Sequence, residues 1–307
     1  MVHAREIAIL NFRVRILLQR KSNEKNKRES DSRFLFIYYA MIRIVIILFN
    51  MKKIKISSKD NEKIKNLKKL NQKKYREKLG QFFIENIKIA FDAAKQNILP
   101  QAIFITEEFE ERNKKELDFV LKKSKLDEYY LIDEKINKRF SNLDTPSGFA
   151  AVYERLNTKI DYSKPIIYLN GINDPGNLGT ILRSALAFNM KNVVLDSDCA
   201  DLYNFKTLNA AKDSFFKLNI EFDKANKILK NIKKQMPIYS TRLKGGEEPK
   251  SLKKQKLFCV VLGSEAHGVD QKIQKMSDGF IKIKMSDEIE SLNVATAAAI
   301  IFYELYK

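Results

Sequence analysis

The spacing of apolar residues changes from helical to strand-like several times between residues 58 and 154. Helical spacing is predicted first in the basic segment NEKIKNLKKLNQKKYREKLG, and it continues through QFFIENIKIAFDAAKQN. A strand, a helix and a second strand are then predicted at LPQAIFITEEF, ERNKKELDFVLKKS and EYYLID. A turn and another short strand follow in SNLDTPSGFAAVYE. These elements predict a small, lysine-rich α/β unit.

Strands and helices alternate more regularly from residue 164 onwards. The polar segment RLNTKIDYSKP ends in Pro165, so we place a domain boundary near residues 154–164. Strands are predicted at PIIYLN, NVVLD, PIYST, LFCVVLG and GFIKIKM. Helices are predicted at GTILRSALAFN, ANKILKNIKKQ and SLNVATAAAIIFYELYK, and a flexible loop at RLKGGEEPKSLKKQK. This alternation predicts a largely parallel sheet with helices on both faces over residues 164–307.

Residues 1–50 differ from the rest of the chain. A charged run is followed by FLFIYYAMIRIVIILF, which is 16 residues long and contains Arg43. A membrane span needs about 18–20 apolar residues, and a central arginine is costly there. No small-residue cleavage site follows, which argues against a secretory signal. We favour an extension from a mis-assigned start, with Met51 as the true initiator; a signal anchor and a buried helix or strand stay open.

The charge balance points to a polyanionic partner. The chain has 57 Lys and Arg against 38 Asp and Glu, a formal net charge of +19. Such an excess concentrates polyanions near the surface, which makes nucleic acid the first partner to consider. An AT-rich genome that uses lysine freely would produce a similar count, so the charge alone does not decide.

Few residues are available for disulfide, zinc or histidine chemistry. The two cysteines, Cys199 and Cys259, are too few for a disulfide framework, which indicates a reducing, cytoplasmic compartment. His3 and His267 are the two histidines. We therefore expect no metal site and no histidine-based catalytic triad.

Three loops that follow predicted strands carry the candidate chemistry. Their sequences are GINDPGNLGT, GSEAHGVD and SDEIESLNVAT. Ligands of α/β proteins bind at the carboxyl ends of strands. Each loop taken alone also fits a structural turn, because Gly and Asn tolerate left-handed backbone angles and Ser291 would suit the cap of the last helix. Neither a G-x-G-x-x-G nor a G-x-x-x-x-G-K-[ST] motif is present.

Taken together, the loops resemble the three motifs of the SpoU (TrmH) branch of the SPOUT methyltransferases. The first motif, N-x-G-x-x-x-R-x-A, is matched by Asn177, Gly179, Arg183 and Ala185. The second, G-x-E followed by a glycine, is matched by Gly263, Glu265 and Gly268. The third, I-x-M followed by S-L-N-V-[SA]-x-A, is matched by Ile283, Met285, Ser291, Leu292, Asn293, Val294, Ala295 and Ala297. The chain departs from the usual pattern at Ala266, His267 and Lys284.

The resemblance implies a fold with two parts. Residues 164–307 would form a mostly parallel α/β domain containing a deep trefoil knot. Residues 58–154 would form a smaller, L30e-like α/β domain that binds the RNA substrate, although Asn86 stands where the family more usually has glycine. In that domain Tyr75, Phe82 and Phe83 are candidates for stacking on unpaired bases, while the two phenylalanines fit a core better.

The resemblance also implies an activity. Members of the family transfer a methyl group from S-adenosylmethionine to a ribose 2′-hydroxyl of RNA, and they act as homodimers. Family analogy favours ribosomal over transfer RNA and does not name the nucleotide. Two other classes stay open: a catalytically inactive RNA-binding assembly factor of the ribosome with the same fold, and a regulator that senses S-adenosylmethionine. The intact motifs argue against the first, and the lysine-rich domain argues against the second.

The family assigns Arg183 to the reacting hydroxyl. A guanidinium stays protonated, so we expect Arg183 to stabilise developing negative charge and not to act as a base. We expect Glu265 to orient Arg183 through a charge-assisted pair. The PGN turn would let Asn177 and Arg183 face one point, with Gly179 leaving room for backbone or RNA.

Other residues receive roles from the resemblance alone. Ser291 and Asn293 match positions near the substrate ribose and phosphate. Main-chain groups of Gly263, Ile283 and Leu292 would hold the cofactor, and Thr241 is a further candidate.

Overall fold

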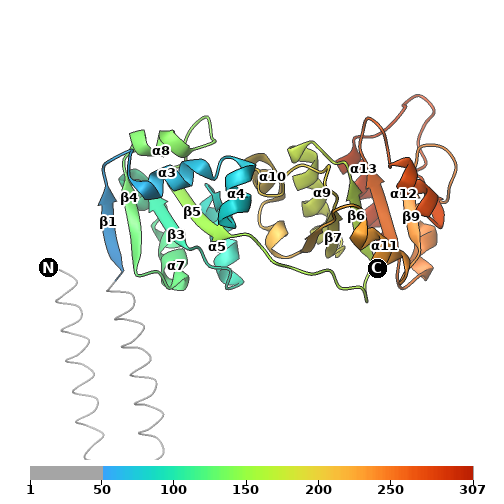
Figure 1. The fold of residues 1–307 in the computed structure, drawn as a ribbon, viewed down its shortest axis with the longest axis horizontal. Helices are drawn as coiled ribbons and strands as arrows, with labels where there is room; N and C mark the ends of the chain where they lie inside the picture. Colours follow the sequence, from blue (N-terminus) through green and yellow to red (C-terminus); the bar gives the residue numbers. More distant parts are fainter. Residues whose placement is uncertain (1–50, 307) are drawn as a thin grey trace, which may run out of the picture. The chain divides into compact units, whose positions relative to one another are not determined.

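A computed structural model describes residues 51–306. The interpretations of residues 1–50 as an extension, an anchor or a buried segment fall outside the described residues. Residues 52–306 belong to one compact unit organised around two β-sheets (Figure 1). Among residues 51–306, no helix is both long and apolar enough to cross a membrane.

The first sheet has five strands in the order β1-β4-β3-β5-β2. β1, β4 and β3 are parallel, whereas β5 runs antiparallel to β3 and β2. The strands are β1 Lys52–Ile56, β2 Gln81–Ile84, β3 Ala102–Ile105, β4 Glu128–Ile132 and β5 Phe149–Glu154. The helices are α3 Glu62–Lys69, α4 Lys73–Leu79, α5 Ile87–Lys95, α6 Glu107–Arg112, α7 Lys114–Ser124 and α8 Glu134–Phe140. The pattern predicts β3, β4 and β5 but not β1 or β2.

β2 corrects the prediction that helical spacing runs through its segment. Gly80 ends α4 with a φ of 65°, a left-handed conformation that glycine adopts without steric cost. Beyond it, Phe82 and Phe83 belong to core clusters on opposite faces of the strand. Their side chains are 0% and 8% exposed, so the expected core role of both is confirmed. Tyr75, half-buried on α4, stays a candidate for stacking.

The second sheet has six strands in the order β11-β9-β10-β6-β7-β8, and every neighbouring pair is parallel. The strands are β6 Ile166–Asn170, β7 Asn192–Leu195, β8 Asn219–Phe222, β9 Ile238–Thr241, β10 Cys259–Gly263 and β11 Gly279–Ile281. The α-helices are α9 Pro175–Ala187, α10 Phe205–Ala211, α11 Lys227–Lys233, α12 Gln271–Met276 and α13 Val294–Leu305. The predicted α/β class with a largely parallel sheet is confirmed.

Apolar side chains alternate between the two faces of this sheet. Ile167 and Leu169 of β6 pack with α9 and α13 in one cluster, whereas Ile166 and Tyr168 pack with α11 and α12 in another. Continuous apolar runs such as IIYL and CVVL are typical of strands that are covered on both sides. The expected arrangement of helices on both faces is thereby confirmed.

The prediction of a flexible loop at RLKGGEEPKSLKKQK is partly wrong. The second half of this segment forms the 3₁₀-helix η2, Pro249–Lys254, whose Leu252 is buried in the core. Before it, Glu247 pairs with Ile281 of β11 as an isolated bridge. Pro249 is the first residue of η2. A main-chain N–H at this position would have no partner within the helix, so proline costs no hydrogen bond there. A polar segment that contains proline can therefore still form a helical turn.

The polar segment predicted as a domain boundary connects the two sheets, since β5 ends at Glu154 and β6 begins at Ile166. The limits of the domains themselves stay a prediction. Aromatic side chains pack between the two halves: the ring centroids of Phe82 and Tyr203 lie 4.6 Å apart, and those of Tyr153 and Phe216 lie 5.6 Å apart. The hydrophobic core therefore continues from one half of the chain into the other.

Candidate active site

The first motif loop is the start of a helix. Asp174 is the N-cap of α9, and its carboxylate accepts a hydrogen bond of 2.7 Å from the main-chain N–H of Asn177. Pro175 occupies the first helical position, where its missing N–H costs nothing. The PGN sequence therefore forms the first turn of α9, and Asn177 is the third residue of this helix.

One carboxylate oxygen joins all three motif loops. Oε1 of Glu265 accepts hydrogen bonds from Nδ2 of Asn177 at 2.8 Å and from Nδ2 of Asn293 at 2.7 Å. Asn293 Nδ2 also lies 3.1 Å from Oδ1 of Asn177, and the main-chain N–H of Val294 lies 3.4 Å from the same Glu265 oxygen. We call Asn177, Glu265 and Asn293 the Asn–Glu–Asn cluster. Charge-assisted hydrogen bonds of this kind hold loops in a fixed relation.

Asn293 has a second role at the start of α13. Its Oδ1 accepts hydrogen bonds from the main-chain N–H groups of Ala295 and Thr296, at 2.9 and 3.3 Å. It is therefore the N-cap of this helix, in place of the Ser291 that the sequence suggested for that role. Ser291 itself is exposed.

The expected pair between Glu265 and Arg183 does not form within this chain. Arg183 is exposed and makes no ion pair of 4.0 Å or less with any residue in the described range 51–306. Asn177 and Arg183 are six positions apart, which at about 100° per residue turns their side chains about 120° away from each other. Helical periodicity therefore does not favour the expectation that both face one point from α9, which stays a prediction.

Gly179 does leave room for backbone, as expected. A Cβ atom at this position would lie 2.5 Å from the carbonyl oxygen of Thr207 and 2.5 Å from Cβ of Ala210. The neighbour is thus α10, which packs closely against α9. Only glycine permits this approach.

A cavity of about 510 Å³ lies beside the Asn–Glu–Asn cluster. Its wall includes every residue that the resemblance assigned to the cofactor, namely Thr241, Gly263, Ile283 and Leu292. It also includes two residues assigned to catalysis, Glu265 and Ser291. Pockets for small molecules commonly measure about 300–1,000 Å³. The tertiary structure therefore brings together segments that are far apart in the sequence.

Gly263 shapes the wall of this cavity. A Cβ atom there would come within 2.1 Å of the carbonyl carbon of Gly268. The contact is fixed by two main-chain hydrogen bonds between Ser264 and Gly268, of 3.1 and 2.9 Å. Any side chain at position 263 would push the loop out of place.

The cavity fits the S-adenosylmethionine that the resemblance implies. Its wall combines apolar side chains, such as Leu262 and Val294, with the glycine main chain of the second motif loop. Apolar walls suit an adenine ring, and main-chain groups suit its polar edge. The hydroxyl of Thr241 donates to the carbonyl of Val261 at 3.1 Å, so towards the cavity it can act only as an acceptor.

Several polar residues of the cavity wall were not predicted as site residues, among them Arg242 and His267. Arg242 follows β9, and its guanidinium lies 3.9 Å from the centre of the Phe280 ring. His267 is exposed, and its main-chain N–H donates to Oγ of Ser264 at 3.2 Å. The signal for Arg242 was available, because a basic residue directly follows the predicted strand PIYST.

Two family models match the sequence. The SpoU rRNA Methylase family matches residues 164–303, and the MRM3-like substrate binding domain matches residues 61–151. The chain is 30% identical over 251 residues to the 23S rRNA (guanosine(2553)-2′-O)-methyltransferase RlmP of Bacillus subtilis, which covers 81% of this chain and 98% of that protein. It is 34% identical over 146 residues to the 23S rRNA (guanosine-2′-O-)-methyltransferase RlmB of Xanthomonas axonopodis pv. citri, which covers 45% of this chain and 57% of that protein.

A solved structure shares the fold. The AdoMet-bound rRNA methyltransferase from Sinorhizobium meliloti superimposes with a TM-score of 0.72 at 21% identity, covering 82% of this chain and 97% of that chain. At this identity the likeness shows the fold alone. The RlmP match, by contrast, extends over nearly the whole relative, and the SpoU family model spans all three motif loops. The chain therefore belongs to the SpoU (TrmH) family of S-adenosylmethionine-dependent RNA 2′-O-ribose methyltransferases.

Proposed function

We propose that this protein methylates a ribose 2′-hydroxyl of ribosomal RNA. The observation that carries the proposal is the Asn–Glu–Asn cluster, which ties the three motif loops together beside a cavity of cofactor size. A guanosine of the large-subunit RNA is the first nucleotide to test, because RlmP, whose name states that specificity, matches over 98% of its length.

The chain's own residues have to align the two reactants and stabilise charge. Bound S-adenosylmethionine supplies a methyl group already activated by its sulfonium. We propose that Gly263, Ile283 and Leu292 hold the cofactor through main-chain groups, and that Ser291 and Asn293 contact the substrate ribose and phosphate. Positioning of this kind lowers the barrier by making the reaction effectively intramolecular.

We propose that Arg183 stabilises the oxygen of the hydroxyl as its proton leaves to water or to the RNA. A guanidinium stays charged at neutral pH, so it acts as a fixed positive charge where negative charge develops. Because Arg183 is exposed and separated from Glu265 within one chain, we propose that it completes the site in a homodimer. The trefoil knot and the L30e-like character of the first domain are part of the same proposal.

An exposed aromatic surface supports the homodimer. Tyr303 and Tyr306 at the end of α13 are 64% and 50% exposed. Their rings pack edge-on against Phe188 at the end of α9, with centroids 5.8 and 6.1 Å away. Aromatic side chains are enriched at protein interfaces, and α9 is the helix that carries Arg183.

The test uses the full-length protein and S-adenosylmethionine with a labelled methyl group. Ribosomal and transfer RNA fractions are taken from cells that lack the protein, and the methylated nucleotide is located by mass spectrometry. We expect a 2′-O-methyl product in the ribosomal fraction only. A product in transfer RNA would contradict the proposed substrate. Tight binding of either RNA without transfer would favour the inactive assembly factor.

Replacing Asn293 by alanine removes both its hydrogen bond to Glu265 and the N-cap of α13. A control that loses only an N-cap separates these two effects. Loss of an N-cap costs about 1 kcal/mol of the free energy of unfolding. Asp133→Ala is the matched control, because Asp133 caps α8 outside the site by accepting from the main-chain N–H of Ile136. We expect a larger stability loss for Asn293→Ala in urea denaturation, because it also removes the hydrogen bond to Glu265, and a fall in methyl transfer for Asn293→Ala alone. Equal activity in the two variants would show that the cluster has no role in the reaction.

A further inference from the structure

A second cavity lies where the two halves of the chain meet. Its volume is about 120 Å³, and its wall combines side chains of the first half with residues of α10 and the loop before it. We call it the junction pocket; the residues that matter below are Asn71, Phe83, Glu85, Asn142, Phe205 and Asn209. A cavity of about 150 Å³ is known to accept a single benzene ring. The junction pocket is smaller than that, so it has room for one edge of a base and not for a whole cofactor.

The carboxylate of Glu85 lines this pocket. Its Oε2 accepts a hydrogen bond of 3.0 Å from the main-chain N–H of Asn142, whereas its Oε1 is closed off inside the protein. An ionised carboxylate has about four lone-pair sites, so Oε2 can accept a further hydrogen bond. Burial raises the pKa of the Glu85 carboxyl above its ordinary value, and a further donor to this carboxylate would lower it again.

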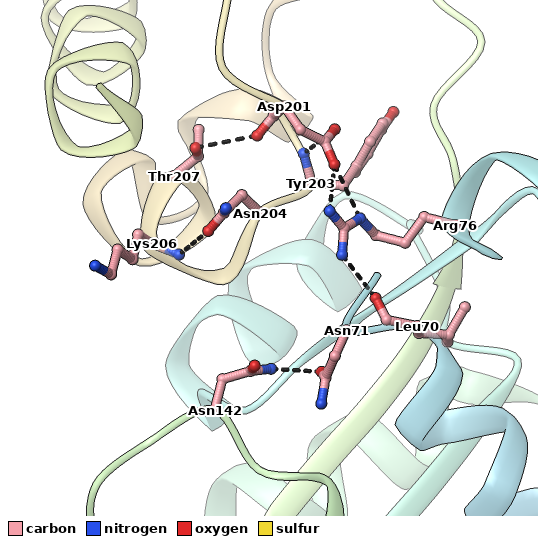
Figure 2. Close-up of polar contacts among 9 residues, drawn as sticks. All are labelled: Leu70, Asn71, Arg76, Asn142, Asp201, Tyr203, Asn204, Lys206 and Thr207. Atoms are coloured by element: carbon pink, nitrogen blue, oxygen red, sulfur yellow. Dashed lines mark hydrogen bonds and ion pairs between the residues drawn. The ribbon is translucent and has the colours of Figure 1, made fainter. Parts of the chain in front are cut away.

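The polar wall around Glu85 is held in place before any ligand arrives. Figure 2 shows Nδ2 of Asn142 donating to Oδ1 of Asn71, at 2.6 Å. Nδ2 of Asn71 in turn donates to the carbonyl of Phe140 at 2.8 Å. These amides are therefore fixed by each other and by the main chain, which reduces the ordering cost of binding.

An ion pair fixes the two halves on either side of the pocket. In Figure 2 the guanidinium of Arg76 meets the carboxylate of Asp201, and Nη1 of Arg76 also donates to the carbonyl of Leu70 at 2.7 Å. The side chains of Arg76 and Asp201 are only 7% and 12% exposed. Asp201 also accepts from the main-chain N–H of Tyr203 at 3.1 Å. The walls of the junction pocket are thus rigidly connected.

The junction pocket lies on the same edge of the second sheet as the catalytic loops. β6 and β7 are parallel, so the loops that follow them leave the sheet at one edge. The loop after β6 leads to Asn177 on α9, and the loop after β7 leads to Asp201 and α10. Because α10 packs directly on α9 at Gly179, an RNA strand in the active site would pass close to this pocket.

We propose that the junction pocket receives the hydrogen-bonding edge of an unpaired base of the substrate RNA, one whose ring N–H donates to Glu85. The inference rests on the proposed function, because it assumes that RNA is the substrate. Guanine and uracil carry such a ring N–H, whereas adenine and cytosine carry a ring nitrogen acceptor at the corresponding position. Proteins recognise RNA sequence mainly through unpaired bases that are inserted into pockets and read along this edge. Phe83 and Phe205 supply the apolar surface that a base requires.

The test measures binding of short, single-stranded RNA oligonucleotides to the full-length protein in the absence of turnover. The oligonucleotides consist of adenosines with one variable central base, and binding is followed by fluorescence anisotropy. We expect central guanosine or uridine to bind about tenfold tighter than central adenosine or cytidine, the discrimination typical of one good base contact. Equal affinities for all four would overturn the proposal.

Glu85→Gln tests the carboxylate itself. The substitution preserves the size of the side chain but replaces the charged carboxylate by a neutral amide, in which one acceptor oxygen becomes an NH2 donor. The preference for guanosine and uridine should therefore disappear, and their affinity should fall about tenfold. The matched control is Glu77→Gln, an exposed position on α4. Removing a negative charge there should slightly strengthen the binding of every oligonucleotide. If Glu85→Gln strengthened binding in the same uniform way, the base contact would be refuted.

A second variant tests the pocket without touching Glu85. Asn209→Trp places a bulky ring into the wall of the junction pocket, and it should also abolish the base preference. Affinity for S-adenosylmethionine, measured for each variant by calorimetry, should equal that of the unmodified protein and thereby shows that the fold is intact. Retained base preference in Asn209→Trp with unchanged cofactor affinity would contradict the location.

The two proposals can fail separately. If the unmodified protein methylates ribosomal RNA but shows no base preference, the junction pocket is wrong and the proposed function stands. If it shows the base preference but transfers no methyl group to any RNA, the pocket is supported and the catalytic proposal fails.

Discussion

Arg183→Ala is expected to reduce the rate of methyl transfer by about 10²–10³-fold, the usual effect of removing a group that stabilises transition-state charge. Arg183 is exposed on α9 and takes no part in the Asn–Glu–Asn cluster. Its loss should therefore leave the fold and the affinity for S-adenosylmethionine unchanged. The measurement is single-turnover transfer to the RNA fraction identified as substrate, combined with calorimetry of cofactor binding.

Two controls define the meaning of that result. Lys206→Ala removes an exposed cation from α10, and it should alter transfer only slightly if the Arg183 effect is specific. Arg183→Lys keeps the charge but loses the planar fork of donors, so it should recover part of the rate. A loss of only a few-fold in Arg183→Ala, well under about 1.4 kcal/mol of transition-state stabilisation, would mean that Arg183 is not central to the reaction.

Asp201→Ala is expected to lower the free energy of unfolding by about 3–5 kcal/mol, because it leaves the Arg76 guanidinium buried without its partner. Both side chains of this pair are nearly buried, and they come from different halves of the chain. Adding Arg76→Met to Asp201→Ala should restore part of the loss, since it removes the stranded charge. Urea denaturation of the single and double variants measures this coupling.

An exposed pair provides the contrast. On the surface of α3, Nζ of Lys65 lies 3.3 Å from Oε1 of Glu62, and the two side chains are 45% and 75% exposed. Exposed pairs contribute about 0–1 kcal/mol, so Glu62→Gln should have little effect on unfolding. If Asp201→Ala were equally mild, the Arg76–Asp201 pair would not be what holds the two halves together.

The sequence determined most of the second half of the fold. Strands such as β6 and β10 are apolar runs of nearly uniform burial, and such runs predict a sheet covered on both faces. Short elements with mixed patterns were not predicted, among them α10, β8 and α12. Their positions depend on neighbours: α10, for example, is placed by the close approach of its backbone to Gly179.

The sequence also indicated the candidate site residues, because Asn177, Glu265 and Asn293 match the family motifs in type and spacing. Only the tertiary structure decided how they pair. Glu265 is 88 positions from Asn177 and 28 from Asn293, and no local pattern states whether its carboxylate will meet these amides or the Arg183 guanidinium. The same reason applies to Arg76 and Asp201, which are 125 positions apart. Periodicity along a chain encodes which side chains are buried, whereas the partner of a buried or polar group depends on how distant segments pack.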